Sequence, residues 1–333
     1  MNILLVQLSF LGDTILSTPV IPGIKKIHPE ARLSVMTTPL AAGLFENDPL
    51  VDDILIFDKR GAEKNVTGLF KKSKSLRKRS FDKVYSLHRS HRTAMLLYLS
   101  KIPVRIGFRD ANMSFLYSDK RKKDLNNHAA LRNLSLLYKE IDRNKLNPDL
   151  RLYPPSPETL SAETAETLPL SGGFIVMAPG SAWKTKQWSW KEYRKTCEHF
   201  IEQGLKVILV GGKADMETCS RISSGLDVID YSGKISLSET MYIISRSTLV
   251  ICNDSMSLHM ASAFKKPTVA VFCATSPEFG FGPWQNPRAV VVQDETLSCK
   301  PCRRHGSNRC PNRTETCMNL PAETVIEVAE GLL

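Results

Sequence analysis

The chain has 333 residues, of which 42% are hydrophobic, and it carries a formal net charge of +11. One hydrophobic core rarely serves a chain of this length, so we expect two domains of about 150 residues each. No apolar run approaches the roughly 20 residues of a membrane span, and the first eight residues lead into a strand without an export signal, which indicates a cytoplasmic protein. The positive charge indicates an anionic partner: nucleic acid, an anionic membrane surface or a phosphorylated substrate.

The first half of the sequence alternates short apolar runs with amphipathic stretches, the pattern of an α/β domain with a parallel sheet. Residues 3–8 predict its first strand, and the turn that follows contains Asp13. A turn in this position lies at the carboxyl edge of the sheet, where such domains bind ligands. Asp13 is therefore either the N-cap of the next helix or a general base that takes a proton from an attacking hydroxyl.

Two stretches of this half are strongly basic. Residues 59–83 contain ten Lys or Arg against two acids, with apolar residues at helical spacing. They predict a basic amphipathic helix, either a solvated face or a contact with an anionic membrane or phosphorylated lipid. Residues 81–87 predict a strand that delivers His88, Arg89 and Arg92 to the carboxyl edge, where they suit a phosphate or an acidic sugar, with a solvated loop as the alternative.

Prolines concentrate in residues 147–170, which we interpret as an interdomain linker. The α/β pattern then restarts with a strand at 173–177 and a turn that contains Gly180 and Ser181, with Lys186 shortly after it. Backbone amides in this turn and the Lys186 ammonium suit a phosphate. The turn matches neither the Walker A pattern nor G-x-G-x-x-G, which counts against a P-loop NTPase and a standard dehydrogenase.

Residues 249–277 predict a strand, a polar turn, a helix and a second strand. The start of the helix offers free backbone N–H groups, and the hydroxyls of Ser255 and Ser257 add donors for an anionic ligand. Asp254 is negative, so it either faces sugar hydroxyls or caps the helix.

In their order and spacing, these motifs resemble glycosyltransferase family 9, the heptosyltransferases that build the inner core of lipopolysaccharide. The likeness comprises Gly12-Asp13-Thr14, Arg89–Ala94, Arg105-Ile106-Gly107, His128 with Arg132-Asn133, Pro179–Trp188, and Asn253–His259 with Pro267–Pro277. The resemblance implies an α/β fold of the GT-B type, with two Rossmann-like doubly wound domains facing a central cleft. Residues 1–160, including the linker, would bind the acceptor and 161–321 the nucleotide-sugar donor, and 322–333 would form a helix that packs back on the first domain.

The resemblance also implies a reaction. The enzyme would be an inverting transferase that moves a heptose from ADP-heptose to the phosphorylated lipid A–core oligosaccharide, without a cofactor, at the inner face of the inner membrane. Asp13 would be the general base, and Lys186 would stabilise the departing diphosphate. The implied donor-binding residues are Gly180, Ser181, Lys186, Asp254, Ser255, Met256 and Ser257, and the implied acceptor-binding residues are Gly12, Thr14, His88, Arg89 and Arg92.

Two features depart from a simple member of this family. Met256 stands where members usually carry glycine, which puts the pose and the identity of the donor in question. Four thiols near the end of the chain, in Cys299, Cys302, Cys310 and Cys317, offer a tetrahedral zinc site, although only the first pair has zinc-finger spacing. The alternative is that they are free thiols or an unstable redox pair.

Other functions remain open at this point. A transferase for another nucleotide sugar would differ in donor preference, and a non-catalytic sugar-nucleotide binder would bind without turnover. A nucleic-acid binder is suggested by the charge alone, because the basic stretch has few aromatics and no recognisable binding motif, and we do not expect nucleic acid as a partner.

Overall fold

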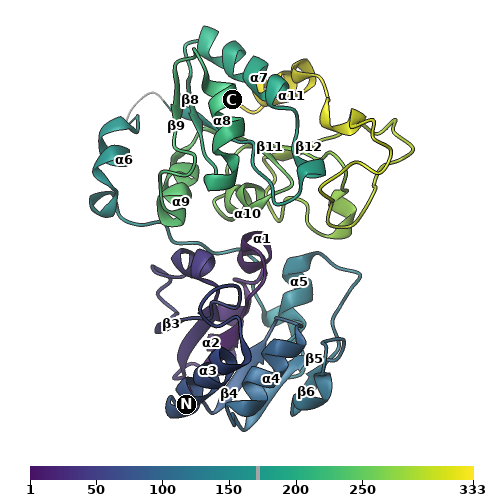
Figure 1. The fold of residues 1–333 in the computed structure, drawn as a ribbon. Coiled ribbons are helices and arrows are strands. Elements are labelled where there is room, and N and C mark those ends of the chain that lie inside the picture. Colours follow the sequence, from purple (N-terminus) through teal and green to yellow (C-terminus); the bar gives the residue numbers. More distant parts are fainter. Residues whose placement is uncertain (170–172) are drawn as a thin grey trace. The chain divides into compact units, whose positions relative to one another are not determined.

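The computed structural model describes residues 1–169 and 173–333, and the chain forms two compact units, Met1–Tyr153 and Pro154–Leu333 (Figure 1). The predicted boundary at residue 160 lies inside the second unit. There the Ser161 amide donates to the Glu239 carboxylate at 2.9 Å, and the Thr164 hydroxyl donates to the same oxygen at 3.0 Å. Leu170, the last residue of the predicted linker, lies outside the described residues.

The first unit contains a six-stranded parallel sheet of order β3-β2-β1-β4-β5-β6. Its strands are β1 (Asn2–Val6), β2 (Arg32–Thr37), β3 (Asp53–Ile56), β4 (Lys83–Ser86), β5 (Val104–Phe108) and β6 (Asp119–Arg121). Its helices are α1 (Leu11–Ile15), α2 (Val20–Ile27), α3 (Val66–Lys78), α4 (His91–Leu99) and α5 (Ala129–Leu134). Leucines of α3 and α4 pack with Leu4 and Val6 of the central strand, so β1 is nearly fully buried, as its apolar sequence predicts.

The second unit repeats this topology, with a parallel sheet of order β12-β11-β10-β7-β8-β9. Its strands are β7 (Phe174–Ala178), β8 (Lys206–Leu209), β9 (Val228–Asp230), β10 (Leu249–Asn253), β11 (Thr268–Val271) and β12 (Ala289–Val292). Its helices are α6 (Ala162–Thr167), α7 (Trp190–Glu202), α8 (Met216–Ser223), α9 (Leu237–Arg246), α10 (Met256–Ala263) and α11 (Ala322–Glu330). In both units the first strand lies beside the fourth, which is the doubly wound order of a Rossmann-like domain. This confirms the predicted fold class.

The C-terminal helix belongs to the second unit. Its buried residues Ala322, Val325 and Ala329 belong to the hydrophobic core of the second unit. Helix α11 packs there against α7, β11 and β12 (Figure 1). Its apolar face is therefore used within the second unit, and the predicted packing on the first domain stays a prediction.

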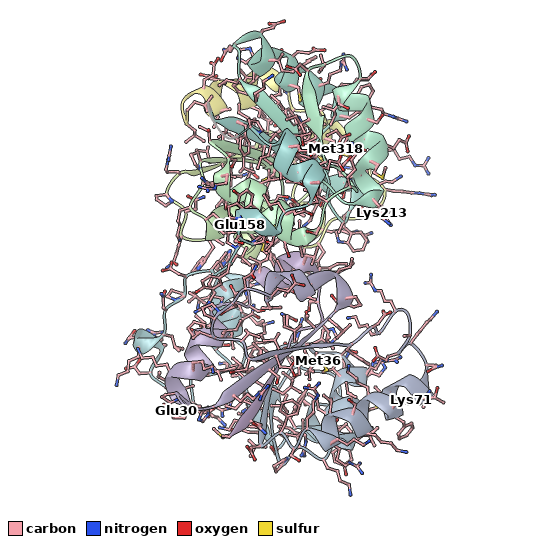
Figure 2. All side chains as sticks on the ribbon, turned by 90° about the vertical axis from the view of Figure 1, so that its left-hand side faces the viewer. Glu30, Met36, Lys71, Glu158, Lys213 and Met318 are labelled. Carbon is pink, nitrogen blue, oxygen red and sulfur yellow. The ribbon has the colours of Figure 1, made fainter. Side chains whose placement is uncertain are left out.

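The surface of the first unit carries the predicted basic helix, which is shorter than the basic stretch in the sequence. Met36 of β2 lies inside the sheet, whereas Lys71 of α3 lies at the surface (Figure 2). Lys59 and Arg60 precede the helix and lie in the loop after β3. In the part of the chain that the structure describes, no helix is both long enough and apolar enough to cross a membrane.

Candidate active site

The topology of each unit locates one candidate ligand site. A doubly wound sheet binds its ligand at the carboxyl edge, where the strand order reverses. In the first unit this point lies between β1 and β4; the helix after β1 carries Asp13, and the loop after β4 carries His88. In the second unit it lies between β7 and β10, followed by Gly180 and Asp254. The predicted residues therefore gather at the switch point of their own sheet.

Asp13 is the third residue of α1 and is partly exposed. The N-cap of this helix is Phe10, so Asp13 does not have the capping position that was the alternative to a catalytic role. Gly12 is also partly exposed. Thr14, by contrast, is buried and its hydroxyl donates to the Phe10 carbonyl at 3.0 Å. Because this hydroxyl is enclosed and used within the helix, the structure does not support the predicted acceptor contact of Thr14.

His88 has a different character from the one predicted. Its Nδ1 lies 2.7 Å from the Thr93 hydroxyl, and its Nε2 lies 3.3 Å from the ammonium of Lys59. Burial, followed by the positive charges of Lys59 and Arg89, lowers the pKa of His88 to about 3. The ring is therefore neutral at physiological pH and is not a cation for a phosphate.

The two arginines of the same stretch divide their roles. Arg92 donates to the carbonyls of Glu63 and Lys64, and to that of Asn65 at 3.1 Å. Its guanidinium thereby fixes the loop before α3, which replaces the predicted acceptor contact with a structural role. The side chain of Arg89 remains half exposed and pairs with the Asp110 carboxylate at 2.5 Å. Of the three predicted residues, Arg89 is therefore the one whose exposed positive charge suits an anionic ligand.

Two lysines at this edge were missed by the sequence analysis. Lys59 donates to the carbonyl of Leu8, the residue before the Asp13 loop, at 2.5 Å. Lys123 follows β6, and its charge interacts with those of Asp13 and Arg89. The sequence offered little to distinguish them, because Lys59 stood in a long basic stretch and Lys123 in a charged loop.

In the second unit, two predicted residues form an ion pair. The ammonium of Lys186 lies 2.6 Å from the carboxylate of Asp254, and both side chains are largely buried. The hydroxyl of Thr275, which the sequence analysis did not select, donates to the same carboxylate at 2.7 Å. Asp254 therefore holds Lys186 in place and does not cap α10, whose N-cap is Ser255.

The side chain of Asn253, at the end of β10, forms hydrogen bonds with the segment that follows β7. Its side-chain oxygen accepts from the Trp188 amide at 3.0 Å, and its side-chain nitrogen donates to the Pro179 carbonyl at 2.7 Å. The Ser181 hydroxyl adds a bond of 3.2 Å to the Asp254 carbonyl. The turn after β7 and the turn after β10 thus form one rigid constellation, in which Ser181 is a link between the loops.

The start of α10 and the Gly180 turn complete the predicted donor site. Ser255 does not cap the helix with its side chain, and its buried hydroxyl oxygen has no hydrogen-bond partner among the described residues. Met256, the first helical residue, is partly exposed, whereas Ser257 is buried. A Cβ atom at Gly180 would lie 2.4 Å from the Asp215 carboxylate, so any larger residue would displace the Asp215 side chain. Burial raises the pKa of Asp215, although the Gly212 amide donates to it.

The cysteine-rich segment near the end of the chain packs on the Lys186 loop. Thr185 donates from its amide to the Ser307 carbonyl at 3.0 Å, and the Ser307 amide donates back to the Thr185 hydroxyl at 2.8 Å. Burial, followed by the neighbouring thiols, raises the pKa of Cys317 to about 11. Among the described residues, no three His, Cys, Asp or Glu side chains are arranged to hold a metal ion. The zinc site at Cys299, Cys302, Cys310 and Cys317 stays a prediction.

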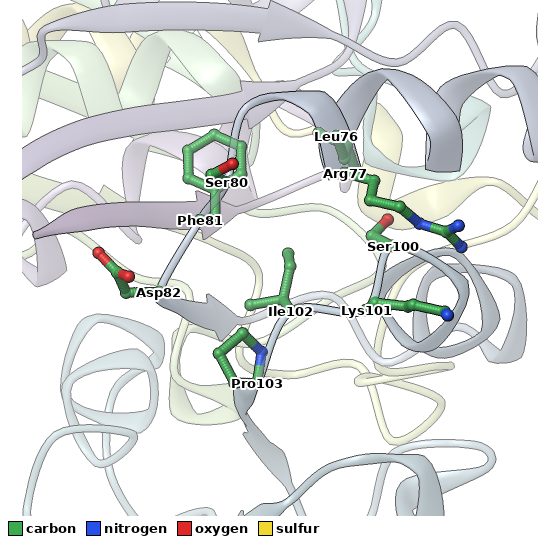
Figure 3. A pocket seen from close by; sticks show the side chains of 9 residues that line it. All are labelled: Leu76, Arg77, Ser80, Phe81, Asp82, Ser100, Lys101, Ile102 and Pro103. Atoms are coloured by element: carbon green, nitrogen blue, oxygen red, sulfur yellow. The ribbon is translucent and has the colours of Figure 1, made fainter.

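A separate hollow of about 290 Å³ lies at the other end of the first sheet (Figure 3). Its lining includes Phe81 and Asp82, which precede β4, and Ile102 and Pro103, which precede β5. These positions are at the amino edge of the sheet. The hollow is therefore distinct from the candidate site at the carboxyl edge.

Two Rossmann-like doubly wound units are the architecture of GT-B proteins. The sequence profile of one family matches residues 69–311, and the chain belongs to that family, glycosyltransferase family 9 (heptosyltransferase). The protein is thus a glycosyltransferase, which confirms the predicted family and enzyme class.

Individual relatives agree with this assignment. The chain is 25% identical to lipopolysaccharide heptosyltransferase 2 of Escherichia coli K12, over 84% of either chain. It is 28% identical to lipooligosaccharide heptosyltransferase 2 of Haemophilus influenzae, over 84% of this chain and 85% of that one. Among solved structures, the ADP-heptose lipopolysaccharide heptosyltransferase II of E. coli superposes with a TM-score of 0.82 at 23% identity, covering 100% of this chain and 98% of that one. The structural likeness supports the fold.

Proposed function

We propose that this glycosyltransferase moves a heptose from ADP-heptose to the inner core of lipopolysaccharide, with inversion at the anomeric carbon. The observation that carries the proposal is the position of Asp13, a partly exposed carboxylate at the switch point of the first sheet that does not serve as the N-cap of its helix. Such a carboxylate suits a general base. The names of the relatives supply the substrate class, since they are lipopolysaccharide or lipooligosaccharide heptosyltransferases.

In the proposed reaction, each proton, bond and electron pair is accounted for by the two substrates and by residues of this chain. Asp13 accepts the proton of an acceptor hydroxyl, whose oxygen forms a bond to the anomeric carbon of the donor. The bond between that carbon and the diphosphate oxygen breaks on the opposite face, and ADP leaves with the electron pair. Lys186 and the N-terminus of α10 stabilise the charge that develops on the diphosphate. The Asp254 carboxylate holds the Lys186 ammonium at 2.6 Å. The ammonium is therefore oriented before ADP-heptose binds.

The role of Asp13 is tested by Asp13→Asn. We expect kcat to fall at least about a hundredfold, the usual weight of a general base, while ADP binding stays unchanged. Asp119→Asn is the control, because Asp119 is a carboxylate of the same unit that lies in β6 and pairs with Arg121 and Lys139. Wild-type turnover in Asp13→Asn would refute its assignment as the base.

The donor is tested by thermal shift with ADP, UDP and GDP. A nucleotide at about 100 times its Kd stabilises a protein by about 2.7 kcal/mol, so a specific ligand raises the melting temperature measurably. We expect ADP alone to do so, as the E. coli heptosyltransferase structure with ADP-2-deoxy-2-fluoro heptose suggests. The alternative is a transferase for another nucleotide sugar, which Met256 at the start of α10 favours. Stabilisation by UDP or GDP in place of ADP would select that alternative.

We further propose that the enzyme works as a peripheral protein on the anionic inner face of the inner membrane, with α3 as the contact. Val66 and Phe70 on this helix are 66% and 48% exposed, and Lys71, Lys74 and Lys78 are exposed beside them. A helix with exposed apolar and basic residues suits an anionic lipid surface. Replacement of these three lysines by serine should abolish cosedimentation with vesicles that contain anionic lipid, whereas replacement of Lys206, Lys213 and Lys234 in the second unit should not. Equal cosedimentation of both variants would refute the role of α3.

A further inference from the structure

The loop after β6 places a lysine at the carboxyl edge of the first sheet, two residues beyond the end of the strand. The ammonium of Lys123 lies 5.0 Å from the centroid of the Phe108 ring, and Phe108 is the buried last residue of the neighbouring strand β5. Lys120 and Lys122 of the same segment are exposed, whereas Lys123 is partly buried. Lys123 is therefore the lysine that this segment directs toward the protein.

Charged groups from several elements surround Lys123. Burial is the largest influence on it, and with the positive charge of Arg89 it lowers the pKa of Lys123 to about 8. Asp110 and Asp13 act in the opposite direction, and Arg132 adds a further positive charge. The Asp110 carboxylate is already paired with Arg89 at 2.5 Å. Arg89 and Arg132 thus oppose the charge of Lys123 while Asp13 and Asp110 favour it, and an added anion would favour the charged form further.

The donors of Lys123 have no acceptor of their own. An ammonium carries three N–H donors, and partly buried charges in proteins are normally paired or hydrogen-bonded. Among the described residues, Lys123 makes no hydrogen bond and no ion pair, and its ammonium lies over the face of Phe108. An aromatic face accepts the charge from one side and leaves the other N–H groups for a ligand.

We infer that Lys123 binds an anionic group of the acceptor, a phosphomonoester or a sugar carboxylate, and so positions the acceptor next to Asp13. This inference rests on the proposed function, because it assumes that the first unit binds the acceptor. Lys123 contributes binding, whereas Asp13 contributes proton transfer. Kinetic measurements therefore distinguish the two residues: loss of the Lys123 contact should raise the acceptor KM, whereas loss of the Asp13 base should lower kcat.

The test is Lys123→Met, with truncated lipopolysaccharide that lacks heptose or carries one heptose as the acceptor. We expect the acceptor KM to rise at least about tenfold, the contribution of one hydrogen bond to a charged group, with kcat within about twofold. ADP stabilisation should not change. Lys123→Arg should restore most of the affinity, and Lys122→Met, which alters the exposed neighbour, should match the wild type. An unchanged KM in Lys123→Met would overturn the inference.

Equilibrium binding of the same acceptor without donor gives a readout independent of transfer. If the wild type binds acceptor but does not use ADP-heptose, the proposed function fails, while weaker binding by Lys123→Met still supports the inference. Equal binding by the two proteins would overturn the inference even if transfer occurs.

The source of the anion is resolved by changing the acceptor. Phosphatase treatment should remove the difference between wild type and Lys123→Met if the partner is a phosphomonoester. Reduction of the sugar carboxyl groups should remove it if the partner is a carboxylate. A difference that survives both treatments would overturn the role of Lys123 as an anion ligand.

The pH dependence provides a second signature. Lys123 is charged below a pH of about 8 and loses its proton above that value, so the wild-type acceptor KM should rise above pH 8. Lys123→Arg stays charged throughout this range, so its KM should not rise there. The same rise in both proteins would assign the pH effect to another group and count against the inference.

Discussion

The buried ion pair between Lys186 and Asp254 makes a quantitative prediction about the donor site. Two unit charges 2.6 Å apart attract each other by about 6 kcal/mol at an effective dielectric constant of about 20, and desolvation of both groups offsets part of this. Lys186→Met leaves the Asp254 carboxylate, which is 5% exposed, with one neutral hydrogen bond from Thr275. We therefore expect a loss of about 3 kcal/mol, near the lower end for a broken buried pair.

The assay uses the distribution of tryptophan in the chain. All four tryptophans, at positions 183, 188, 190 and 284, belong to the second unit, so intrinsic fluorescence follows the unfolding of that unit. For a unit of this size each kcal/mol lowers the melting temperature by roughly 2–4 °C, so Lys186→Met should melt about 6–12 °C below the wild type.

A double-mutant cycle decides whether the pair itself is responsible. Asp254→Asn should also destabilise, because it leaves the Lys186 ammonium largely buried without its counterion. The double variant removes both charges and should lose at least about 2 kcal/mol less than the sum of the single losses. Additive losses would refute the reasoning that the two charges stabilise each other.

Two further predictions concern the same unit. Gly180→Ala should destabilise by about 1–3 kcal/mol and weaken the thermal shift with ADP, because the added methyl group collides with the Asp215 carboxylate and displaces the turn; an unchanged ADP shift would contradict this. Glu239 should make the unit acid-sensitive: burial opposes its ionisation, but hydrogen bonds from Ser161 and Ser236 lower the pKa of Glu239 to about 2, from 4.5 in an unfolded chain. Its stabilising contribution is fully present above pH 4.5 and is lost as the pH falls toward 2, so melting curves between pH 6 and 3 should show a smaller decline in Glu239→Gln than in the wild type.

The fold was predictable because its signals are local. Apolar runs such as residues 3–8 mark buried parallel strands, and the alternation with helices marks a doubly wound sheet. The domain boundary was less accessible, since it depends on hydrogen bonds from Ser161 and Thr164 to Glu239, far along the chain. The packing of α11 in the second unit was not predictable for the same reason: the sequence of the helix shows an apolar face but not the residues that cover it.

The candidate site was predictable in position and less so in role. Asp13, Gly180 and Asp254 lie at switch points, as expected for turns after central strands. Their partners come from elsewhere in the sequence: Thr275 to Asp254, and Asp215 to Gly180. A residue type shows what a side chain is able to do, whereas the hydrogen bonds it makes in the fold show what remains for a ligand.

The basic residues of the first unit show how this distinction identifies a site. The Arg92 guanidinium donates to backbone carbonyls of a loop. The buried Arg121 forms ion pairs with Asp119 at 2.7 Å and Glu140 at 3.2 Å. These contacts tie both arginines to the fold of the first unit, although Nε of Arg92 and Nε and Nη1 of Arg121 have no hydrogen-bond partner among the described residues. Lys71 faces solvent. Lys123 is partly buried, yet it makes no hydrogen bond or ion pair within the described part of the chain. Net charge therefore suggested an anionic partner, and the contacts of each cation led to the proposal that Lys123 binds it.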